Sequence, residues 1–332
     1  MMNLDQVRVI DPILTQLAQG YKNAEGVATF FAPAVSMNVR AGRTLVFGKE
    51  AFAAQNFLRA PGTNIQKIQN QFGTRSFSLR QEAISWEIAE EVASEAKNGA
   101  AQIDLRQYAA KDAANRLMQS WEVQVAAIVT DDTQYEPGNV LDLDTYNGGA
   151  DQFTAPTSDI EVLMDQAKEQ VRSQIGIYPN KMVISPDAFN ALKRNKRIRD
   201  FMQRGVLVDE KTLAQIFGLD EIRVARRLKL NQETGALENI YSNIAVLFYH
   251  PSASTDGFMP ALDANYGNPA FAYTYTLSGY PIATPERFNV DRRVFTGDIL
   301  VERSFELVGM GETGYCGSGF VFKNPVGTLA IP

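Results

Sequence analysis

The chain has 332 residues, a formal net charge of −6 and a sequence pI near 5.1. This acidic balance argues against a dedicated nucleic-acid binder, whose affinity comes from Lys and Arg side chains that neutralise phosphates. The acidic charge does not exclude a protein container that encloses DNA without binding it tightly. The single cysteine, Cys316, excludes an intrachain disulfide and is expected to be a buried free thiol. No apolar stretch reaches the roughly 18 residues of a membrane span, and the first residues lack a signal-peptide core, so we expect synthesis in the cytoplasm.

The first 35 residues are predicted to form a helical arm. Pro12 interrupts its pattern, and Gly20 is a plausible helix stop. The apolar positions keep a helical spacing: Leu4, Val7, Ile10, Ile13, Leu14 and Leu17. The apolar run over 26–36 predicts packing onto a larger body.

Residues 36–90 show the alternation of β-strands. Phe77 and Leu79 alternate with polar residues, whereas Ile84 and Trp86 alternate in the opposite phase. The change of phase near 81–83 predicts a bulge or a change of supporting surface. We expect one long two-stranded excursion over 36–90. Because an isolated ribbon is marginal in water, these four apolar residues are expected to contact another subunit.

A stretch without Gly or Pro, from Ala100 to Glu136, predicts a long helix over 100–135. Asp104 is its expected N-cap, with Gln107 as the capping-box partner. One apolar stripe runs along it: Leu105, Ala109, Ala113, Leu117, Trp121, Val125 and Ile128. A single stripe indicates that the helix rests on a sheet, with Leu105, Leu117, Trp121 and Val125 as packing residues.

A loop rich in Asp, Thr and Gly over 131–157 leads into a second compact unit. Ser158 and Glu161 form the expected capping box of its first helix, which ends at Gly176. Further elements follow in order: a strand over 181–184, a helix that starts at Ser185–Pro186, a helix over 212–217, and strands over 222–224 and 240–249. The strands after 271 are expected to return under the long helix.

Two motifs with catalytic associations are weak here. Gly309, Gly311 and Gly314 fit dinucleotide-binding spacing, but too little chain follows for the helix that such a site needs, so a turn between strands is favoured. His250, the only histidine, precedes Pro251 at the end of an apolar strand and has no nucleophile motif nearby. A structural histidine is the favoured interpretation.

Two charged clusters remain. Asp131, Asp132, Asp142 and Asp144 lie in the turn-rich loop, where solvated charge is favoured over a glycosidase pair or a metal site. The basic run over 193–199 lacks interleaved aromatic residues. It indicates a solvated face or intersubunit ion pairs, with weak contact to packaged nucleic acid as the second interpretation. We therefore expect no catalytic residues, no cofactor and no metal.

Several segments together resemble a known family. They are Asp11–Leu14, Gly20–Asn23 and Phe30–Pro33, the strand-into-helix segment Lys181–Pro186, and the segment Thr212–Val224. With the order of parts along nearly the whole chain, they resemble a major capsid protein of tailed bacteriophages. These proteins have the Hong Kong 97-like fold, which encapsulins share.

The resemblance implies an α+β fold with an N-arm (1–35), an E-loop (36–90), a P-domain (91–139 and 266–332, with the spine helix over 100–135) and an A-domain (140–265). It implies a structural coat protein, not an enzyme, that self-assembles as hexamers and pentamers into an icosahedral virion shell around double-stranded DNA. Implied partners are other copies of the chain, a portal, decoration proteins and, since the arm begins near Met1, a separate scaffolding protein unless earlier cleavage removed a scaffolding segment. No membrane is involved.

Alternatives stay open at this point. An encapsulin-like compartment shares the fold, and a soluble α/β enzyme that uses the unit over 140–250 would need a convergent polar site. Some relatives join subunits through a Lys–Asn bond. Here Lys49 and Lys67 lie in the expected E-loop, and Asn289 and Asn324 near the C-terminus, but nothing in the sequence pairs them.

Overall fold

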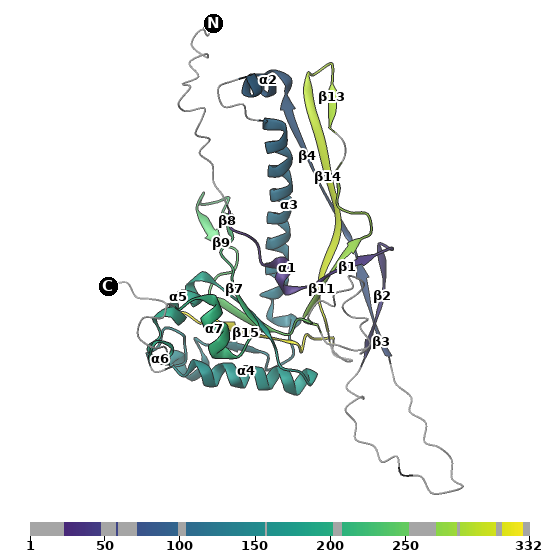
Figure 1. The fold of residues 1–332 in the computed structure, drawn as a ribbon. Coiled ribbons are helices and arrows are strands. Elements are labelled where there is room, and N and C mark those ends of the chain that lie inside the picture. The colour runs from purple at the N-terminus through teal and green to yellow at the C-terminus, as the bar shows by residue number, and fades with distance from the viewer. Residues whose placement is uncertain are drawn as a thin grey trace, which may run out of the picture.

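The computed structural model describes residues 23–47, 58, 72–98, 104–156, 158–201, 208–251, 270–283, 286–309 and 314–327. Figure 1 shows a tall part built around helix α3 and a lower part in which helices cover a second sheet. The helices are α1 (Ala28–Phe31), α2 (Glu90–Asn98), α3 (Leu105–Val129), α4 (Ile160–Ile175), α5 (Pro186–Arg194), α6 (Lys196–Phe201) and α7 (Glu210–Phe217), with short 3-10 turns η3 (Asp132–Gln134) and η4 (Tyr146–Gly149). The strands are β1 (Ala34–Met37), β2 (Ala41–Phe47), β3 (Phe72–Ser78), β4 (Arg80–Ala89), β5 (Val140–Asp142), β6 (Lys181–Ile184), β7 (Glu221–Val224), β8 (Leu228–Leu230), β9 (Leu237–Asn239), β10 (Ile244–Phe248), β11 (Ala272–Leu277), β12 (Ile282–Ala283), β13 (Arg287–Asn289), β14 (Val294–Leu307) and β15 (Gly319–Lys323).

The tall part is a six-stranded sheet organised by the 14-residue strand β14. β14 pairs antiparallel with β4, β11, β12 and β13, and β1 joins as a parallel neighbour of β11. β4 pairs along most of β14, from Ala89 opposite Val294 to Arg80 opposite Arg303. The prediction that all of 36–90 forms a two-stranded excursion is therefore wrong for 80–89. The change of phase near 81–83 lies just after Leu79, where the chain leaves the β2–β3 ribbon and joins the central sheet.

Helix α3 lies against this sheet, and its start agrees with the sequence. The Asp104 carboxylate accepts hydrogen bonds from the backbone N–H groups of Arg106 and Gln107, which closes the first turn. The helix ends at Val129 and not near residue 135. The Thr130 hydroxyl donates to the Ala126 carbonyl, and Asp131 caps a separate 3-10 turn, so local side chains replace the helical bonds.

The lower part is a five-stranded sheet in the order β5–β15–β10–β6–β7. Ser185 caps α5 with Pro186 in its first turn, and α4 and α7 end at Gly176 and Gly218, whose φ values of 80° and 60° favour glycine. The expected Ser158 capping box is absent from α4. Asp159 is the N-cap residue there, and the Ser158 hydroxyl donates to the Asp151 carbonyl instead.

The C-terminal strand β15 is a correction to the predicted P-domain. Residues 266–332 were expected to return together under the long helix, and β11 and β14 do lie in the sheet beside α3. β15 instead pairs antiparallel with β10 and parallel with β5 in the five-stranded sheet. A central strand of that sheet is therefore supplied by the C-terminal segment.

The two parts share one aromatic core at their junction. Phe31 lies fully buried there, with its ring centroid 5.2 Å from that of Phe248 and 5.9 Å from that of Phe271. The same cluster contains Trp121 and Val125 of α3. Residues 27–32 thus pack against the long helix and the lower sheet at once and join the two halves. No described helix is both long enough and apolar enough to cross a membrane.

Candidate assembly surfaces

Strands β2 and β3 form a two-stranded ribbon that projects from the body. They pair from Ala41 opposite Ser78 to Phe47 opposite Phe72 and form a sheet of their own. Figure 1 shows the ribbon extending away from the foot of β14. A ribbon of two strands is marginal in water by itself, so contacts at its base and along its length decide its orientation.

The base of the ribbon is buried within the same chain. Phe77 is 3% exposed, and its ring stacks on Tyr275 with centroids 4.9 Å apart. Leu79 packs against the same small cluster, and its backbone N–H donates to the Arg40 carbonyl at 2.8 Å. The sequence assigned Phe77 and Leu79 to contacts with another subunit. In this structure they anchor the ribbon to its own body.

Two arginines clamp the base to strand β14. Arg40 forms a fork with Glu302, with Nε to Oε2 at 2.8 Å and Nη2 to Oε1 at 2.9 Å. This hydrogen-bonded guanidinium lowers the pKa of the Glu302 carboxyl. On the other strand, Arg75 Nη1 donates to the Leu307 carbonyl at 2.7 Å. Arg40, which directly precedes β2, and Arg75 of β3 are therefore both tied to β14, and these contacts set the direction in which the ribbon leaves the body.

A groove of about 800 Å³ lies between the ribbon base, α3 and β14. The Arg303 guanidinium stands 4.3 Å from the Trp121 ring centroid and pairs with Glu82 at 2.7 Å. Burial raises the pKa of the nearby Glu306 carboxyl. The lining mixes arginines, hydroxyls and rings: Arg43, Ser76, Phe77, Ser78, Arg80, Trp121, Gln124, Ile128, Arg303, Ser304, Phe305 and Glu306, with Ala41 and Gly42.

The other contact residues expected from sequence fall elsewhere. Ile84 and Trp86 are half-buried in β4, and Trp86 lies over Gly297 of β14, where an added Cβ would come within 2.7 Å of the indole. The structure therefore brings Phe77 and Leu79 together but separates Ile84 and Trp86 from them. On α3, Leu117, Trp121 and Val125 are buried, whereas Leu105 is half-buried near the distal end.

The N-terminal segment enters the body through a network of amide groups. The Asn23 side chain donates to the Leu228 carbonyl at 2.8 Å and accepts from the Leu228 N–H at 3.0 Å, as a neighbouring strand would. It also donates to Gln119 of α3 at 3.1 Å. Arg227 Nε donates to the same Gln119 oxygen at 2.7 Å. One side chain thus links the N-terminal segment, the spine helix and strand β8.

Glu122 of α3 completes this entry point. Its carboxylate is buried and accepts the backbone N–H groups of Val27 at 2.8 Å and Ala28 at 3.1 Å. A Cβ at Gly26 would collide with the carboxylate. In the sequence, Glu122 is not among the residues of the predicted apolar stripe. The sequence signs that could have indicated this contact are Gly26 and the acidic residue that directly follows Trp121.

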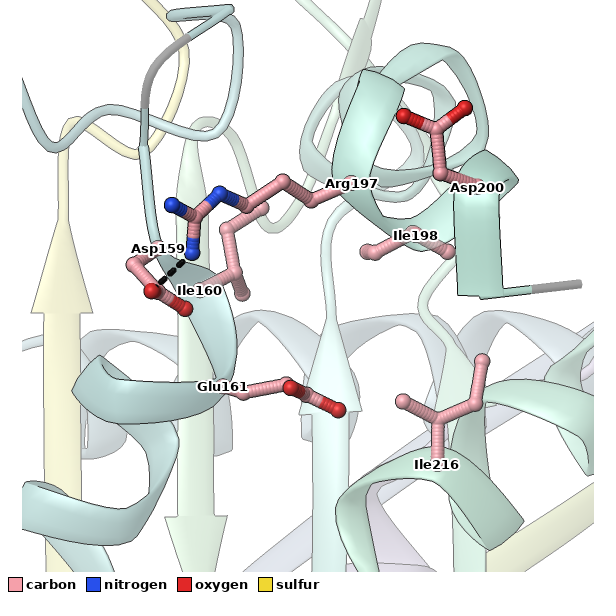
Figure 2. A pocket seen from close by; sticks show the side chains of 7 residues that line it. All are labelled: Asp159, Ile160, Glu161, Arg197, Ile198, Asp200 and Ile216. Carbon is pink, nitrogen blue, oxygen red and sulfur yellow. Dashed lines mark hydrogen bonds and ion pairs between the residues drawn. The ribbon is translucent and has the colours of Figure 1, made fainter.

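A smaller cavity of about 270 Å³ lies between α4, α6 and α7. Figure 2 shows the side chains that line it. Arg197 pairs with Asp159 on one side, and Ile160, Ile198 and Ile216 supply apolar walls. Glu161 and Asp200 also line it. Across the described ranges no group of three or more His, Cys, Asp or Glu side chains is placed to hold a metal ion.

The remaining sequence candidates have structural roles. The backbone N–H of His250 donates a hydrogen bond to the side-chain oxygen of Asn180, and the ring Nδ1 of His250 lies 2.7 Å from the Pro251 carbonyl oxygen. Burial lowers the pKa of the His250 ring. Gly309 and Gly314 approach each other between β14 and β15, while Gly311 lies outside the described residues. Cys316 is buried and free, and burial raises the pKa of its thiol to about 11.

The loop carboxylates act as turn caps and local partners. Asp131 accepts from Thr133, and Asp132 pairs with Lys323. Asp142 accepts from Asn324, and Asp144 from Gln152.

The basic run over 193–199 spans the join of α5 and α6. Asn195 caps the second helix, and Lys193 lies 5.1 Å from the Phe189 ring centroid. Lys49 and Lys67 lie outside the described residues, so the structure does not test a Lys–Asn cross-link to Asn289 or Asn324.

A long helix on a sheet around one long strand, a separate five-stranded unit and a projecting ribbon together define the Hong Kong 97-like capsid fold. By sequence, the chain is 28% identical over 312 residues to the major capsid protein of Burkholderia phage BcepMu, with 92% of this chain and 94% of that protein covered. No family model matches the chain. The prediction of this fold is confirmed, and so is the predicted resemblance to phage major capsid proteins.

Solved structures agree with this fold. A phage-related protein from Bordetella bronchiseptica matches with a TM-score of 0.68 and 23% identity, covering 96% of this chain and 98% of that one. The capsid protein of cyanophage P-SCSP1u matches with a TM-score of 0.59 and 13% identity, covering 92% and 90%. An encapsulin from Synechococcus elongatus matches with a TM-score of 0.50 and 11% identity, covering 95% of each chain. The sequence relative favours a phage capsid over a compartment.

Proposed function

We propose that the chain is the coat subunit of a phage head, assembling as hexamers and pentamers into an icosahedral shell around double-stranded DNA. The observation that carries the proposal is the clamped ribbon β2–β3. Its base is fixed by Arg40 and Arg75, and it projects beyond the body where a second copy can cover it. Closure by symmetry then adds many modest contacts into one stable shell.

The role is structural and not enzymatic. The observation that supports this role is that the sequence relative is a major capsid protein. We infer synthesis in the host cytoplasm, assembly with a separate scaffolding protein and a portal, and weak, non-specific contact with the packaged DNA. The domain division follows the resemblance, with β4 moved to the P-domain and β15 to the A-domain.

The test is assembly of the full chain and of a ribbon variant. In the variant, residues 50–70 are replaced by a short Gly-Ser linker, so that the described β2–β3 pairs are kept. Negative-stain electron microscopy of the full chain, expressed with its neighbouring genes, should show uniform hollow shells. The variant should give folded subunits, with an unchanged thermal melting curve, but no shells.

Two outcomes would count against the proposal. Intact shells from the ribbon variant would remove the ribbon from assembly, and small oligomers from the full chain with every candidate scaffold present would contradict the coat function. Nuclease-protected double-stranded DNA inside native particles selects a phage head. Protein cargo without DNA would select the encapsulin-like compartment.

A further inference from the structure

The groove between the ribbon base, α3 and β14 carries two arginines without a partner. Arg43 of β2 and Arg80 of β4 line it, and both side chains are exposed. Within the described part of the chain, neither guanidinium has a hydrogen bond, an ion pair or an aromatic ring as its partner. The third arginine of the lining, Arg303, is paired with Glu82. The two free cations therefore share the groove with a single lining carboxylate, that of Glu306.

The groups between these arginines are hydrogen-bond donors and apolar surface. Arg43 lies opposite Ser76 in the ribbon, and Arg80 follows Ser76 by four residues, roughly 13 Å along an extended chain. The Ser76 and Ser78 side chains line the groove between them, and half-buried Ile128 supplies apolar surface. Guanidinium groups only donate, and their strongest acceptors are carboxylates. The groove is therefore suited to an acidic segment that also carries an apolar side chain.

Helix α2 presents a surface of this kind. It contains three glutamates and one lysine. Glu90 and Glu91 pair with Arg293, whereas the exposed Glu95 carboxylate has no ion pair among the described residues. Val92 is 52% exposed and lies one turn before Glu95, on the same side of the helix. The outward side of α2 thus combines an exposed apolar residue with a free carboxylate.

The α2 helix of the same chain does not reach this groove. It directly follows β4, whose ten extended residues begin at Arg80. The strand therefore separates Arg80 from the start of α2 by roughly 30 Å. Figure 1 shows α2 at the upper end of the tall part and the β2–β3 ribbon at its lower end. An α2 helix that fills the groove must come from a second copy of the chain.

We propose that α2 of a neighbouring copy lies in this groove, with its Glu95 between Arg43 and Arg80 and its Val92 against Ile128. The proposal rests on the proposed function, because it names one contact between coat subunits. The upper end of one subunit then meets the ribbon base of the next, which is a heterologous contact. Such a contact repeats around a closed ring, as hexamers and pentamers require. Its charge pairs fix the register of neighbouring copies.

Charge reversal tests the proposal in the full chain. Arg80→Glu and Glu95→Arg are made singly and together, expressed with the neighbouring genes and imaged by negative-stain electron microscopy. Each single variant places like charges together, so the yield of shells should fall at least about ten-fold, and the double variant should recover most of it. Arg116→Glu is the matched control, because Arg116 is an exposed arginine on α3 outside the groove. It should leave the yield unchanged and should not rescue Glu95→Arg.

Disulfide trapping in assembled shells gives a second measurement. The variant carries Ser78→Cys and Val92→Cys, with Cys316→Ala to remove the buried thiol. The control replaces Ser78→Cys by Val162→Cys, because Val162 is similarly exposed, at 49%, but lies on α4. Oxidation should give a ladder of linked chains on non-reducing denaturing gels, with 78–92 peptides identified by mass spectrometry. The control should give no ladder.

The outcomes separate this contact from the proposed function. Shells at full yield from either single reversal, a double variant no better than the single variants, or linkage no greater than in the control would overturn the contact. In each case shells from the unmodified chain would leave the coat function standing. Absence of shells from the unmodified chain would overturn the coat function and this contact with it. Circular dichroism establishes that each variant folds, and Arg43→Glu replaces Arg80→Glu if the latter variant does not.

Discussion

Glu122 is the residue on which the entry of the N-terminal segment depends. The buried Glu122 carboxylate is stabilised by two hydrogen bonds, which it accepts from the backbone N–H groups of Val27 and Ala28. These two N–H groups depend on Glu122, because they have no other acceptor within their own short segment. A glutamine of the same shape offers one acceptor and presents its own N–H donors to the other backbone N–H. One buried donor would then be left unsatisfied.

We therefore expect Glu122→Gln to lower the free energy of unfolding by about 1–3 kcal/mol. Asp112→Asn is the matched control on the same helix, because Asp112 pairs with Arg116 at the surface and should change stability by less than about 0.5 kcal/mol. Chemical denaturation of both variants measures the difference. Equal effects would show that Glu122 does not anchor the segment.

Cys316 gives a second prediction at this scale. Its thiol has a pKa raised to about 11 by burial, against an ordinary value of 9.0. The stability that the neutral thiol contributes is fully present below pH 9 and is lost as pH rises through 11, because the unfolded state ionises first. In the native protein at pH 8, alkylation by maleimide should be far slower than in urea. Equal rates would contradict the burial of the thiol.

The ribbon β2–β3 is an element whose position depends on its clamp. Glu302 is buried, and Arg40 lowers the pKa of its carboxyl. A lowered folded-state pKa means that the pairing stabilises the base above the ordinary carboxyl range and is lost as pH falls through the lowered value. Acidification should therefore loosen the ribbon before the whole chain unfolds.

Arg40→Met should reproduce this loosening at neutral pH, since it keeps the aliphatic stem and removes the charge. Hydrogen exchange at the Leu79 amide, which is bonded to the Arg40 carbonyl, should become several-fold faster. Arg116→Met, which removes an exposed pair on α3, is the control and should leave that exchange rate unchanged. Unchanged exchange in Arg40→Met would exclude the clamp.

Local signals predicted several elements from the sequence, and long-range pairing limited the rest. Asp104, Ser185, Gly176 and Gly218 act within one turn of their own position, so the starts and ends that they mark were predicted correctly. The partner of a strand is set by distant residues. The apolar alternation of β4 is the same whether it pairs with a ribbon or with β14, and β15 carries no local sign that it belongs to the lower sheet. Glu122 was missed for the same reason, because its partners lie more than 90 residues away.

At the scale of the molecule, residues 27–32 close the junction between the two parts. Phe30 lies under Lys181 and Arg223, with their charged groups 4.7 and 4.2 Å from its ring centroid, and Phe31 is fully buried. Removing this segment would expose the shared core of α3 and the lower sheet. The N-terminal segment is thus part of the folding unit from Asn23 onward.

Two truncations test this. Deletion of residues 1–22 should leave cooperative unfolding with a melting temperature within a few degrees of the full chain, since no described core residue is lost. Deletion of residues 1–32 removes two buried phenylalanines, each worth about 3–5 kcal/mol, and should abolish cooperative unfolding. Calorimetry distinguishes the two. A cooperative transition in the longer deletion would show that the parts are stable separately.

Strand β14 has a mechanical consequence. It runs from Val294 at the distal end, past the Glu302 clamp, to Leu307 in the junction core, without a break in its pairing. Tension applied at the far tip is therefore carried to the centre of the subunit through covalent backbone and not across a side-chain interface. A container under internal pressure would load each wall element along its strongest direction, with the hydrogen bonds to β4 and β11 strained in shear and not opened one at a time.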